Sequence, residues 1–273
     1  MGREPMRASE ISRRVAFTSL GAVLYAVGAY ATAYIESPWG MGQFRPAVII
    51  PSIFAILFGP WVGGVSGAVG TLIADSIKHG TLYIPSLIAA VPANFLAFYL
   101  LGTLLRGKFR WPRFIAASVL SLALGNVLCA MLYTSYKALI GALPLQLVPG
   151  LTVGLSLWWF ATMMPFQLLA LPPVLKAIVS ALPSLAPLDV REECVSGSTP
   201  RREMMLTLCL TGVLITSVGL AVLFSEEVTS FFVGALTPSL REIVKSLVIA
   251  MFSVTGAVLI VASVLIAVLK RTP

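Results

Sequence analysis

Residues 114–136 read FIAASVLSLALGNVLCAMLYTSY and contain no charged side chain. A helix needs about 20 mostly apolar residues to cross the hydrocarbon core of a bilayer. The run also lacks the strict alternation of apolar and polar residues that a membrane-spanning strand shows. This stretch therefore predicts a transmembrane helix.

Similar runs recur throughout the 273-residue chain, of which 58% is hydrophobic and only 11% is charged. Soluble domains contain about 25% charged residues. Because backbone groups in lipid must be satisfied within helices or closed barrels, the continuous apolar runs favour helices. We predict an all-α, polytopic membrane protein with about eight transmembrane helices. The predicted spans are residues 15–35, 47–58, 61–77, 83–105, 114–137, 151–180, 203–224 and 243–269.

The distribution of Lys and Arg predicts the orientation, because cytoplasmic loops of membrane proteins carry an excess of these residues. With the N-terminus inside, all but five of the 19 Lys and Arg lie in predicted cytoplasmic segments. Both termini are then cytoplasmic, in a multi-pass protein of the plasma membrane. We interpret the net charge of +8 as this topology signal and not as a nucleic-acid-binding patch.

A polar stretch with several prolines at residues 183–202 predicts an exposed cytoplasmic linker. It would separate a six-helix core, residues 1–182, from a C-terminal transmembrane hairpin, residues 203–273. The first span follows basic residues, as a signal peptide would. It is longer than the apolar part of a typical signal peptide, so we interpret it as a retained helix.

Catalytic and cofactor motifs find little support in the sequence. Residues 102–108 (GTLLRGK) match most of a phosphate-binding P-loop, but Phe109 follows where Ser or Thr is needed, and the segment closes an apolar run. We interpret the match as coincidence, so the chain supplies no ATPase of its own. Asp75 alone among the acids lies well within a span, which rules out a catalytic pair of acids, and we predict no enzyme activity. The single histidine excludes a multi-histidine metal site, and no cofactor or metal is predicted.

Residues 36–80 are the richest in polar residues and glycines, beginning with the loop ESPWGMGQFRP at 36–46. Charges at membrane depth are costly and by default mark a function, which draws attention to Arg45 and Asp75. Two interpretations stay open: the two residues pair with each other to hold the loop, or they contact a ligand. His79 lies one helical turn after Asp75, and we expect it to form a satisfied pair with Asp75 near the outer surface.

The predicted fourth to sixth spans carry polar and aromatic side chains that need partners. Amides in lipid bond across helices or to a ligand. Tryptophans there fit either an interfacial belt or stacking on a ligand. In the first span, Ala22-x-x-x-Ala26 forms a stripe of small residues suited to close packing of another helix. The polar and aromatic residues are Asn94, Asn126, Tyr133, Tyr136, Trp158, Trp159 and Gln167.

Up to about residue 182 the chain resembles the substrate-binding S components of energy-coupling factor (ECF) vitamin transporters. The resemblance rests on the six-helix pattern, on residues 44–47 (FRPA) leading into Pro51, and on residues 57–64 (LFGPWVGG) followed by Gly70 and Asp75. The Ala22 and Ala26 stripe is similar to the alanine motif by which that family docks on its transmembrane partner.

The resemblance implies a membrane protein that captures a vitamin or related small molecule from outside. Separate ATPase subunits and a transmembrane coupling subunit would then drive uptake. The ligand would lie in the outer half, among the fourth to sixth helices and beneath the loop after the first. Ala22 and Ala26 would dock on the coupling subunit. The residues expected to bind substrate are Trp39, Arg45, Asp75, His79, Asn94, Asn126, Tyr133, Trp158 and Gln167.

The C-terminal pair of helices exceeds the six-helix core of that family, and its sequence indicates no role. A self-contained secondary transporter is an alternative, although inverted repeats and buried coupling charges are not evident. A non-catalytic membrane assembly protein is another. The sequence does not identify the substrate, and the single histidine argues only against the cobalt and nickel branches of the family.

Overall fold

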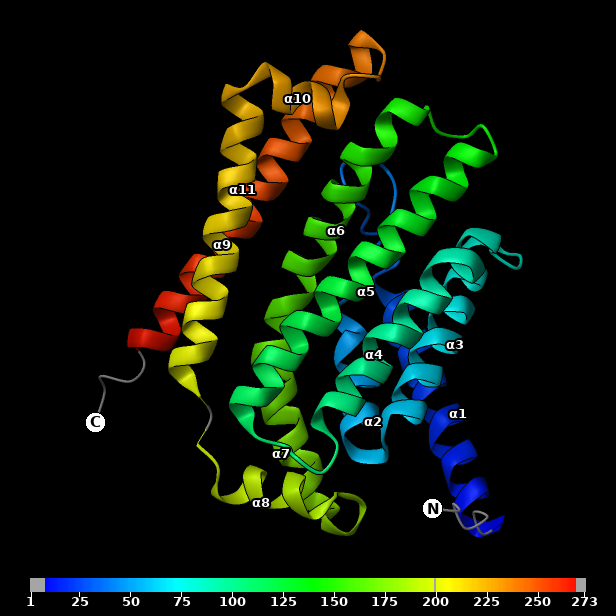
Figure 1. The fold of residues 1–273 in the computed structure, drawn as a ribbon, viewed down its shortest axis with the longest axis vertical. Coiled ribbons are helices and arrows are strands. Elements are labelled where there is room, and N and C mark those ends of the chain that lie inside the picture. Colours follow the sequence, from blue (N-terminus) through cyan, green and yellow to red (C-terminus); the bar gives the residue numbers. More distant parts are fainter. Residues whose placement is uncertain (1–7, 199, 269–273) are drawn as a thin grey trace, which may run out of the picture.

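The computed structural model describes residues 8–198 and 200–268, and this part of the chain is a bundle of helices without strands (Figure 1). Short 3-10 turns at Pro46–Val48, Leu145–Leu147 and Pro183–Leu185 introduce or join helices. The helices are α1 Ala8–Ala31, α2 Ile49–Phe58, α3 Pro60–His79, α4 Val91–Leu105, α5 Trp111–Leu139, α6 Val148–Pro165, α7 Leu171–Ala181, α8 Leu188–Ser196, α9 Arg201–Phe224, α10 Glu226–Val233 and α11 Pro238–Val268.

Among the described residues, six helical segments are long and apolar enough to cross a membrane, which confirms the predicted all-α, polytopic membrane protein. The other two predicted spans correspond to the short apolar segment Pro46–Phe58 and to the glycine-rich α3. The six segments are Ser9–Ala31, Ser86–Leu105, Trp111–Leu139, Leu145–Ala181, Arg201–Phe224 and Pro238–Val268.

Two of these segments contain a π-helical turn, at Ser86–Ala90 before α4 and at Phe166–Ala170 before α7. Each turn precedes a proline, Pro92 or Pro172, that lacks an N–H and whose ring would clash with the carbonyl four residues earlier. A widened turn relieves that clash while the helix continues. The predicted span at residues 151–180 is therefore one continuous helical segment made of α6, the π turn and α7.

The helices α2 and α3 form a tight hairpin. Gly59 joins them with a φ of 98°, which favours glycine, and Pro60 begins α3. A Cβ at Gly63 would lie 2.3 Å from the Cβ of Ala55, so α3 lies directly on α2. Because α2 is buried from Pro51 to Leu57, protein surrounds it and a short helix suffices.

The stripe of small residues on α1 packs against α3 within this chain. Ala22 and Ala26 are only 4% and 5% exposed. A Cβ at Gly70 of α3 would lie 2.7 Å from the carbonyl oxygen of Ala22. In this structure α3 covers the face of α1 that carries Ala22 and Ala26, and the docking of a partner on these two residues stays a prediction. The alanine spacing indicates that a helix packs there but not which helix.

Segments predicted to be cytoplasmic gather at one end of the bundle, which we call the basic end. Arg14 of α1, the turn at Gly59, Arg106 after α4 and Asp189 of α8 line one depression there. The loop at residues 32–45 lies at the opposite end, which we call the loop end. This gathering agrees with the predicted alternation of spans, and the direction across the membrane stays a prediction.

The predicted linker at 183–202 differs from the expected exposed loop, because residues 188–196 form α8. Its carboxylates face the start of α5: Asp189 Oδ2 accepts from the Phe109 amide at 2.9 Å, and Glu193 Oε1 accepts from the Trp111 amide at 3.1 Å. A helix N-terminus has unpaired amides and a partial positive charge, both of which carboxylates satisfy. The short polar helix thus gains its order from a tertiary contact.

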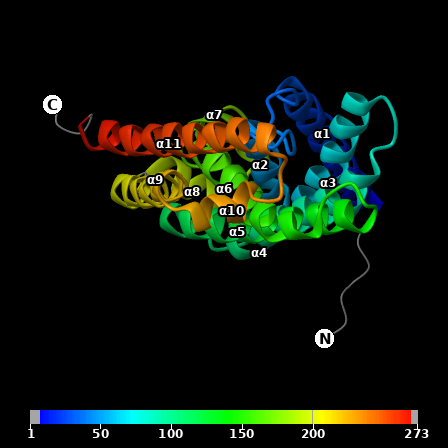
Figure 2. The same ribbon diagram turned by 90° about the horizontal axis from the view of Figure 1, so that it is seen from above.

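The C-terminal helices form an antiparallel pair, α9 and α11, joined across the loop end by α10 (Figure 1). Close backbone approach defines the pair: a Cβ at Gly212 would lie 2.8 Å from the carbonyl oxygen of Gly256. Viewed from above, α9 and α11 lie at one end of the bundle and α1 and α3 at the other (Figure 2). A Cβ at Gly150 would lie 1.9 Å from the Phe231 carbonyl, so α10 lies directly on α6.

Candidate functional site

A cavity lies at the loop end, between residues 40–45 and helices α1, α3, α4, α5 and α6. Ligand sites for small molecules combine apolar walls with a few placed polar groups, and the lining of this cavity has both. Six of the predicted substrate-binding residues line this cavity: Arg45, Asp75, His79, Asn94, Asn126 and Tyr133.

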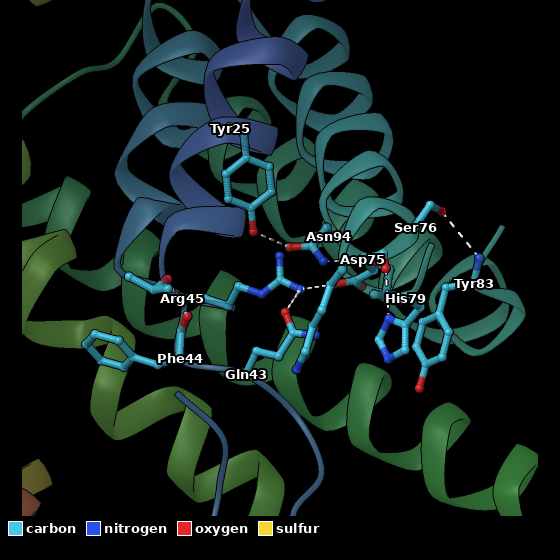
Figure 3. Close-up of polar contacts among 12 residues, drawn as sticks. Tyr25, Gln43, Phe44, Arg45, Asp75, Ser76, His79, Tyr83 and Asn94 are labelled. Carbon is cyan, nitrogen blue, oxygen red and sulfur yellow. Dashed lines mark hydrogen bonds and ion pairs between the residues drawn. The ribbon is translucent and has the colours of Figure 1, made fainter. Parts of the chain in front are cut away.

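A buried ion pair between Arg45 and Asp75 ties the loop to α3 (Figure 3). The same Arg45 nitrogen, Nη2, also donates to Gln43 Oε1 at 2.8 Å. Burial of the guanidinium by itself would lower the pKa of Arg45. The neighbouring Asp75 carboxylate acts in the opposite direction, and the net effect is a raised pKa. The guanidinium therefore stays charged. The interpretation that the two residues pair to hold the loop describes the observed contact.

Several buried hydrogen-bond donors of the cavity lining have no acceptor. Arg45 Nη1, Asn126 Nδ2 and Ser86 Oγ are buried in the cavity lining without a hydrogen-bond partner in the described chain. Asn126 is 7% exposed and Ser86 is 2% exposed. Buried polar groups in proteins are almost always paired, so unpaired ones need an explanation. Because guanidinium and amide N–H groups only donate, a molecule that carries acceptors would complete them.

Asn94 differs from Asn126 in being held by the protein. Its Nδ2 donates to the Ala90 carbonyl at 2.8 Å, and its Oδ1 lies 3.5 Å from the Tyr25 hydroxyl (Figure 3). Tyr25 was not among the residues predicted from the sequence. The residue lies on the buried face of α1 between Ala22 and Ala29, and a large polar side chain within a small-residue stripe was the available signal.

His79 contacts the backbone of Asp75 and not its carboxylate. Its Nδ1 lies 2.8 Å from the Asp75 carbonyl oxygen, and its ring stacks on Tyr83 with centroids 3.7 Å apart (Figure 3). His79 and Asp75 are therefore in contact as expected, but the contact is made through the backbone carbonyl of Asp75. The stacked rings form one wall of the cavity near the start of α4.

The face of α5 toward the cavity carries Asn126, Cys129 and Tyr133. Spacings of three and four residues place side chains on one face of a helix. The sequence analysis named the first and third of these residues and missed Cys129, although the spacing already indicated it. Ala93 and Ala97 of α4, together with Ala90 at the end of the preceding π turn, add small apolar side chains to the lining.

The neighbouring tryptophans Trp158 and Trp159 lie in different surroundings, because successive residues of a helix point about 100° apart. Trp159 lines the cavity, and its Nε1 donates to the Gln43 carbonyl at 3.1 Å. Trp158 was predicted to bind substrate, but it lies in the core outside the lining. Both are buried, so neither belongs to an interfacial belt.

Two more predicted residues lie outside the lining. Gln167, in the π turn, accepts from Ser52 Oγ at 3.1 Å and donates to Ser118 Oγ at 3.3 Å. Its amide therefore finds partners across helices. Trp39, in the loop, lies against α6: a Cβ at Gly154 would be 2.5 Å from its ring.

The P-loop-like segment lies at the end of α4 and in the following turn, where Gly107 has a φ of 65°. A P-loop instead joins a strand to the start of a helix. The local structure therefore agrees with the interpretation that the match is coincidental.

The protein-family model described as ECF-type riboflavin transporter, S component, matches residues 11–164. The matched segment begins in α1, ends in α6 and contains the whole cavity lining, which runs from Tyr25 to Met163. It leaves out α7 to α11. No curated protein and no solved structure matches the chain.

Proposed function

Because the chain belongs to the family of ECF-type riboflavin transporter S components, we propose that it captures a riboflavin-like vitamin in the cavity beneath residues 40–45. As a multi-pass protein of the plasma membrane, it would present this cavity to the outside under the predicted orientation. The six cavity-lining residues predicted from sequence, from Arg45 to Tyr133, are proposed to surround the ligand. Trp39, Trp158 and Gln167 are left out of this proposal.

The observation that carries the proposal is the set of unpaired buried donors. Arg45 Nη1 and Asn126 Nδ2 belong to the cavity lining and have no partner in the described part of the chain. The tricyclic ring of riboflavin carries carbonyl oxygens and ring nitrogens that accept hydrogen bonds along one edge. Hydrogen bonds that involve a charged donor are worth more than neutral ones, so Arg45 would contribute most.

The shape and composition of the walls support a flat ligand. Trp159, Phe98 and Tyr133 supply aromatic surface, and Ala93 and Ala97 supply a smooth face on α4. Flat conjugated rings stack favourably against aromatic side chains in such apolar surroundings. A sugar or an ion would leave most of this apolar surface unused.

Uptake would require the coupling and ATPase subunits with which S components work. The Ala22 and Ala26 stripe is covered by α3, and docking on those subunits through it stays a prediction. The family assignment favours this importer component over a self-contained secondary transporter or an assembly protein.

The direct test is a titration of the detergent-purified protein with riboflavin, followed by quenching of riboflavin fluorescence. We expect saturable binding of one molecule per chain and a gain in stability of about 2.7 kcal/mol at a hundred times the dissociation constant. Thiamine and biotin, which lack the three-ring system, serve as controls. Binding of a control vitamin without binding of riboflavin would contradict the proposed substrate class.

The two neighbouring tryptophans offer a matched pair of variants for that titration. Trp159→Phe removes a cavity-lining ring edge and the bond to Gln43, so we expect riboflavin affinity to fall roughly tenfold. Trp158→Phe changes the same residue type at similar burial outside the lining, and affinity should be unchanged. Equal losses in both variants would place the ligand elsewhere.

A further inference from the structure

The loop at residues 32–45 has two faces, and only one of them belongs to the cavity. Gly42, Gln43 and Arg45 line the cavity. Trp39, on the other face, packs against the C-terminal helices. The loop is folded back on itself as a short hairpin: the Phe44 amide donates to the Ile35 carbonyl at 2.8 Å. The hairpin therefore joins Trp39 to the residues of the cavity face within one hydrogen-bonded loop.

The ring of Trp39 lies between α6 and the C-terminal helices. Its centroid is 6.3 Å from that of Phe232 on α10 and 6.4 Å from that of Phe252 on α11. On the α6 side only glycine fits, because a Cβ at Gly154 would lie 2.5 Å from the ring. The three aromatic residues form one cluster, which we call the Trp39 cluster.

The cluster holds Trp39 through apolar contacts alone. Its Nε1 is buried and has no hydrogen-bond partner in the described residues. A buried donor without an acceptor costs free energy that water would recover if the ring moved out. By contrast, Trp159 on the cavity side donates its Nε1 to the loop at Gln43. The loop is thus anchored by a hydrogen bond on one face and by aromatic packing on the other.

The anchoring rings come from outside the family-matched segment. The match ends at residue 164, whereas Phe232 on α10 and Phe252 on α11 lie beyond it. α10 rests directly on the first turn of α6, where a Cβ at Gly150 would meet the Phe231 carbonyl at 1.9 Å. This close backbone contact fixes the extension against α6, the same helix on which Trp39 packs.

We propose that the C-terminal extension, α9 to α11, holds the 32–45 loop closed over the cavity through the Trp39 cluster and so slows ligand release. Phe232 and Phe252 are positioning residues, which act on the ligand only through the loop. The proposal has two parts. The loop part, that the extension holds the loop in place, stands independently, whereas the release part, that this slows ligand release, rests on the proposed binding function.

Hydrogen exchange measured by mass spectrometry on the ligand-free, full-length protein tests the loop part. Phe252→Ala removes one ring of the cluster, and we expect the loop amides of Ser37, Gly40 and Phe44 to exchange about five- to tenfold faster. Phe224→Ala is the matched control, because this ring on α9 is 81% exposed and lies outside the Trp39 cluster. Its loop amides should exchange at the wild-type rate.

Trp39→Ala removes the same ring contact from the loop side and leaves the sequence of the C-terminal helices unchanged. It should also speed exchange of the loop amides, and it replaces Phe252→Ala as the test if that variant misfolds. In the double variant, exchange should match that of the faster single variant, because both changes remove one contact. Wild-type exchange in the loop of both folded single variants would overturn the proposal.

The role in ligand release is tested by the dissociation rate of riboflavin, which should rise about five- to tenfold in Phe252→Ala and stay unchanged in Phe224→Ala. Faster loop exchange with an unchanged dissociation rate would overturn the role in ligand release. If the wild-type protein binds no riboflavin, the proposed function fails, and hydrogen exchange still decides whether the extension holds the loop.

Discussion

Two carboxylates are buried at opposite ends of this bundle, Asp75 at the loop end and Glu193 at the basic end, with exposures of 4% and 8%. Glu193 meets the start of α5, where the Trp111 amide and Arg110 Nη1 donate to its two oxygens. Asp75 meets Arg45, whose other terminal nitrogen is buried without a hydrogen-bond partner in the described residues. Both carboxylate oxygens of Glu193 accept hydrogen bonds from the protein, whereas the Arg45–Asp75 pair leaves one guanidinium nitrogen of Arg45 able to donate to a ligand.

Burial of a charge therefore does not by itself identify a ligand site. Carboxylates at both ends are expensive to bury and are stabilised by opposite charge or amide donors. Only the completeness of hydrogen bonding around them separates a structural contact from a candidate site. Variants at the two ends should therefore change stability and ligand affinity in different proportions.

The largest effect is expected for Asp75→Asn, which leaves the Arg45 charge buried without its counter-ion. Loss of one partner of a buried pair costs about 3–5 kcal/mol, and unfolding in detergent measures it. Glu36→Gln is the control, because Glu36 pairs with Lys78 at a more exposed position. Exposed pairs contribute less than about 1 kcal/mol. Similar losses in both variants would show that the Asp75 pair is not truly desolvated.

A smaller loss is expected at the other end for Glu193→Gln, which weakens the bonds to the start of α5. We expect unfolding free energy to fall by about 1–3 kcal/mol, while riboflavin affinity stays at the wild-type value. Glu192→Gln changes the exposed neighbour and should be neutral. A change in affinity in Glu193→Gln would break the distinction between the two ends.

Within the loop end, Asn126→Leu should separate affinity from stability. Removing an unpaired buried donor leaves unfolding free energy unchanged or raises it, whereas riboflavin affinity falls about tenfold, or about 1.4 kcal/mol. Asn94→Leu should instead lower stability, because Asn94 bonds to Ala90 and contacts Tyr25. Titration and unfolding of both variants provide the measurement, and the prediction fails if Asn126→Leu destabilises as much as Asn94→Leu.

The smallest effect concerns Cys194 on α8 at the basic end. Burial, together with Glu193 and against Lys176, raises the pKa of its thiol from 9.0 to about 11. Since the folded state holds the proton more tightly, the contribution to stability is complete below pH 9. It is lost as the pH rises toward 11, where the unfolded chain ionises first. Unfolding of Cys194→Ala should lack this part of the alkaline decline, and an identical decline would contradict it.

Much of the fold could be predicted from the sequence, because a helix that crosses a lipid bilayer requires a long apolar run. The runs in α5 and α9 predict helices within three residues of the observed bounds, whereas α1 begins seven residues and α11 five residues before the predicted span. The helix α8 could not be predicted in this way. Its residues are polar, and its Asp189 and Glu193 become ordered by bonding to α5, which lies about 80 residues away in the chain.

The site was predicted in part. Arg45 and Asp75 could be named because charges at membrane depth are costly wherever the chain places them. Trp158 was chosen over Trp159, and the Ala22 stripe was assigned to a partner subunit. In both cases the spacing defines a helix face, and only the position of neighbouring helices decides what that face meets.

The sequence by itself determined the membrane-embedded helical class, the resemblance to ECF S components and the buried groups that demand partners. Each of these depends on the transfer free energy of individual residues and segments, which is local. Tertiary structure alone decided that Arg45 pairs with Asp75, that Asn126 keeps a free donor and that Trp39 packs against Phe252. Such pairings join residues far apart in the chain, and hydrogen bonds and ring contacts form only at the distances that packing of the helices sets.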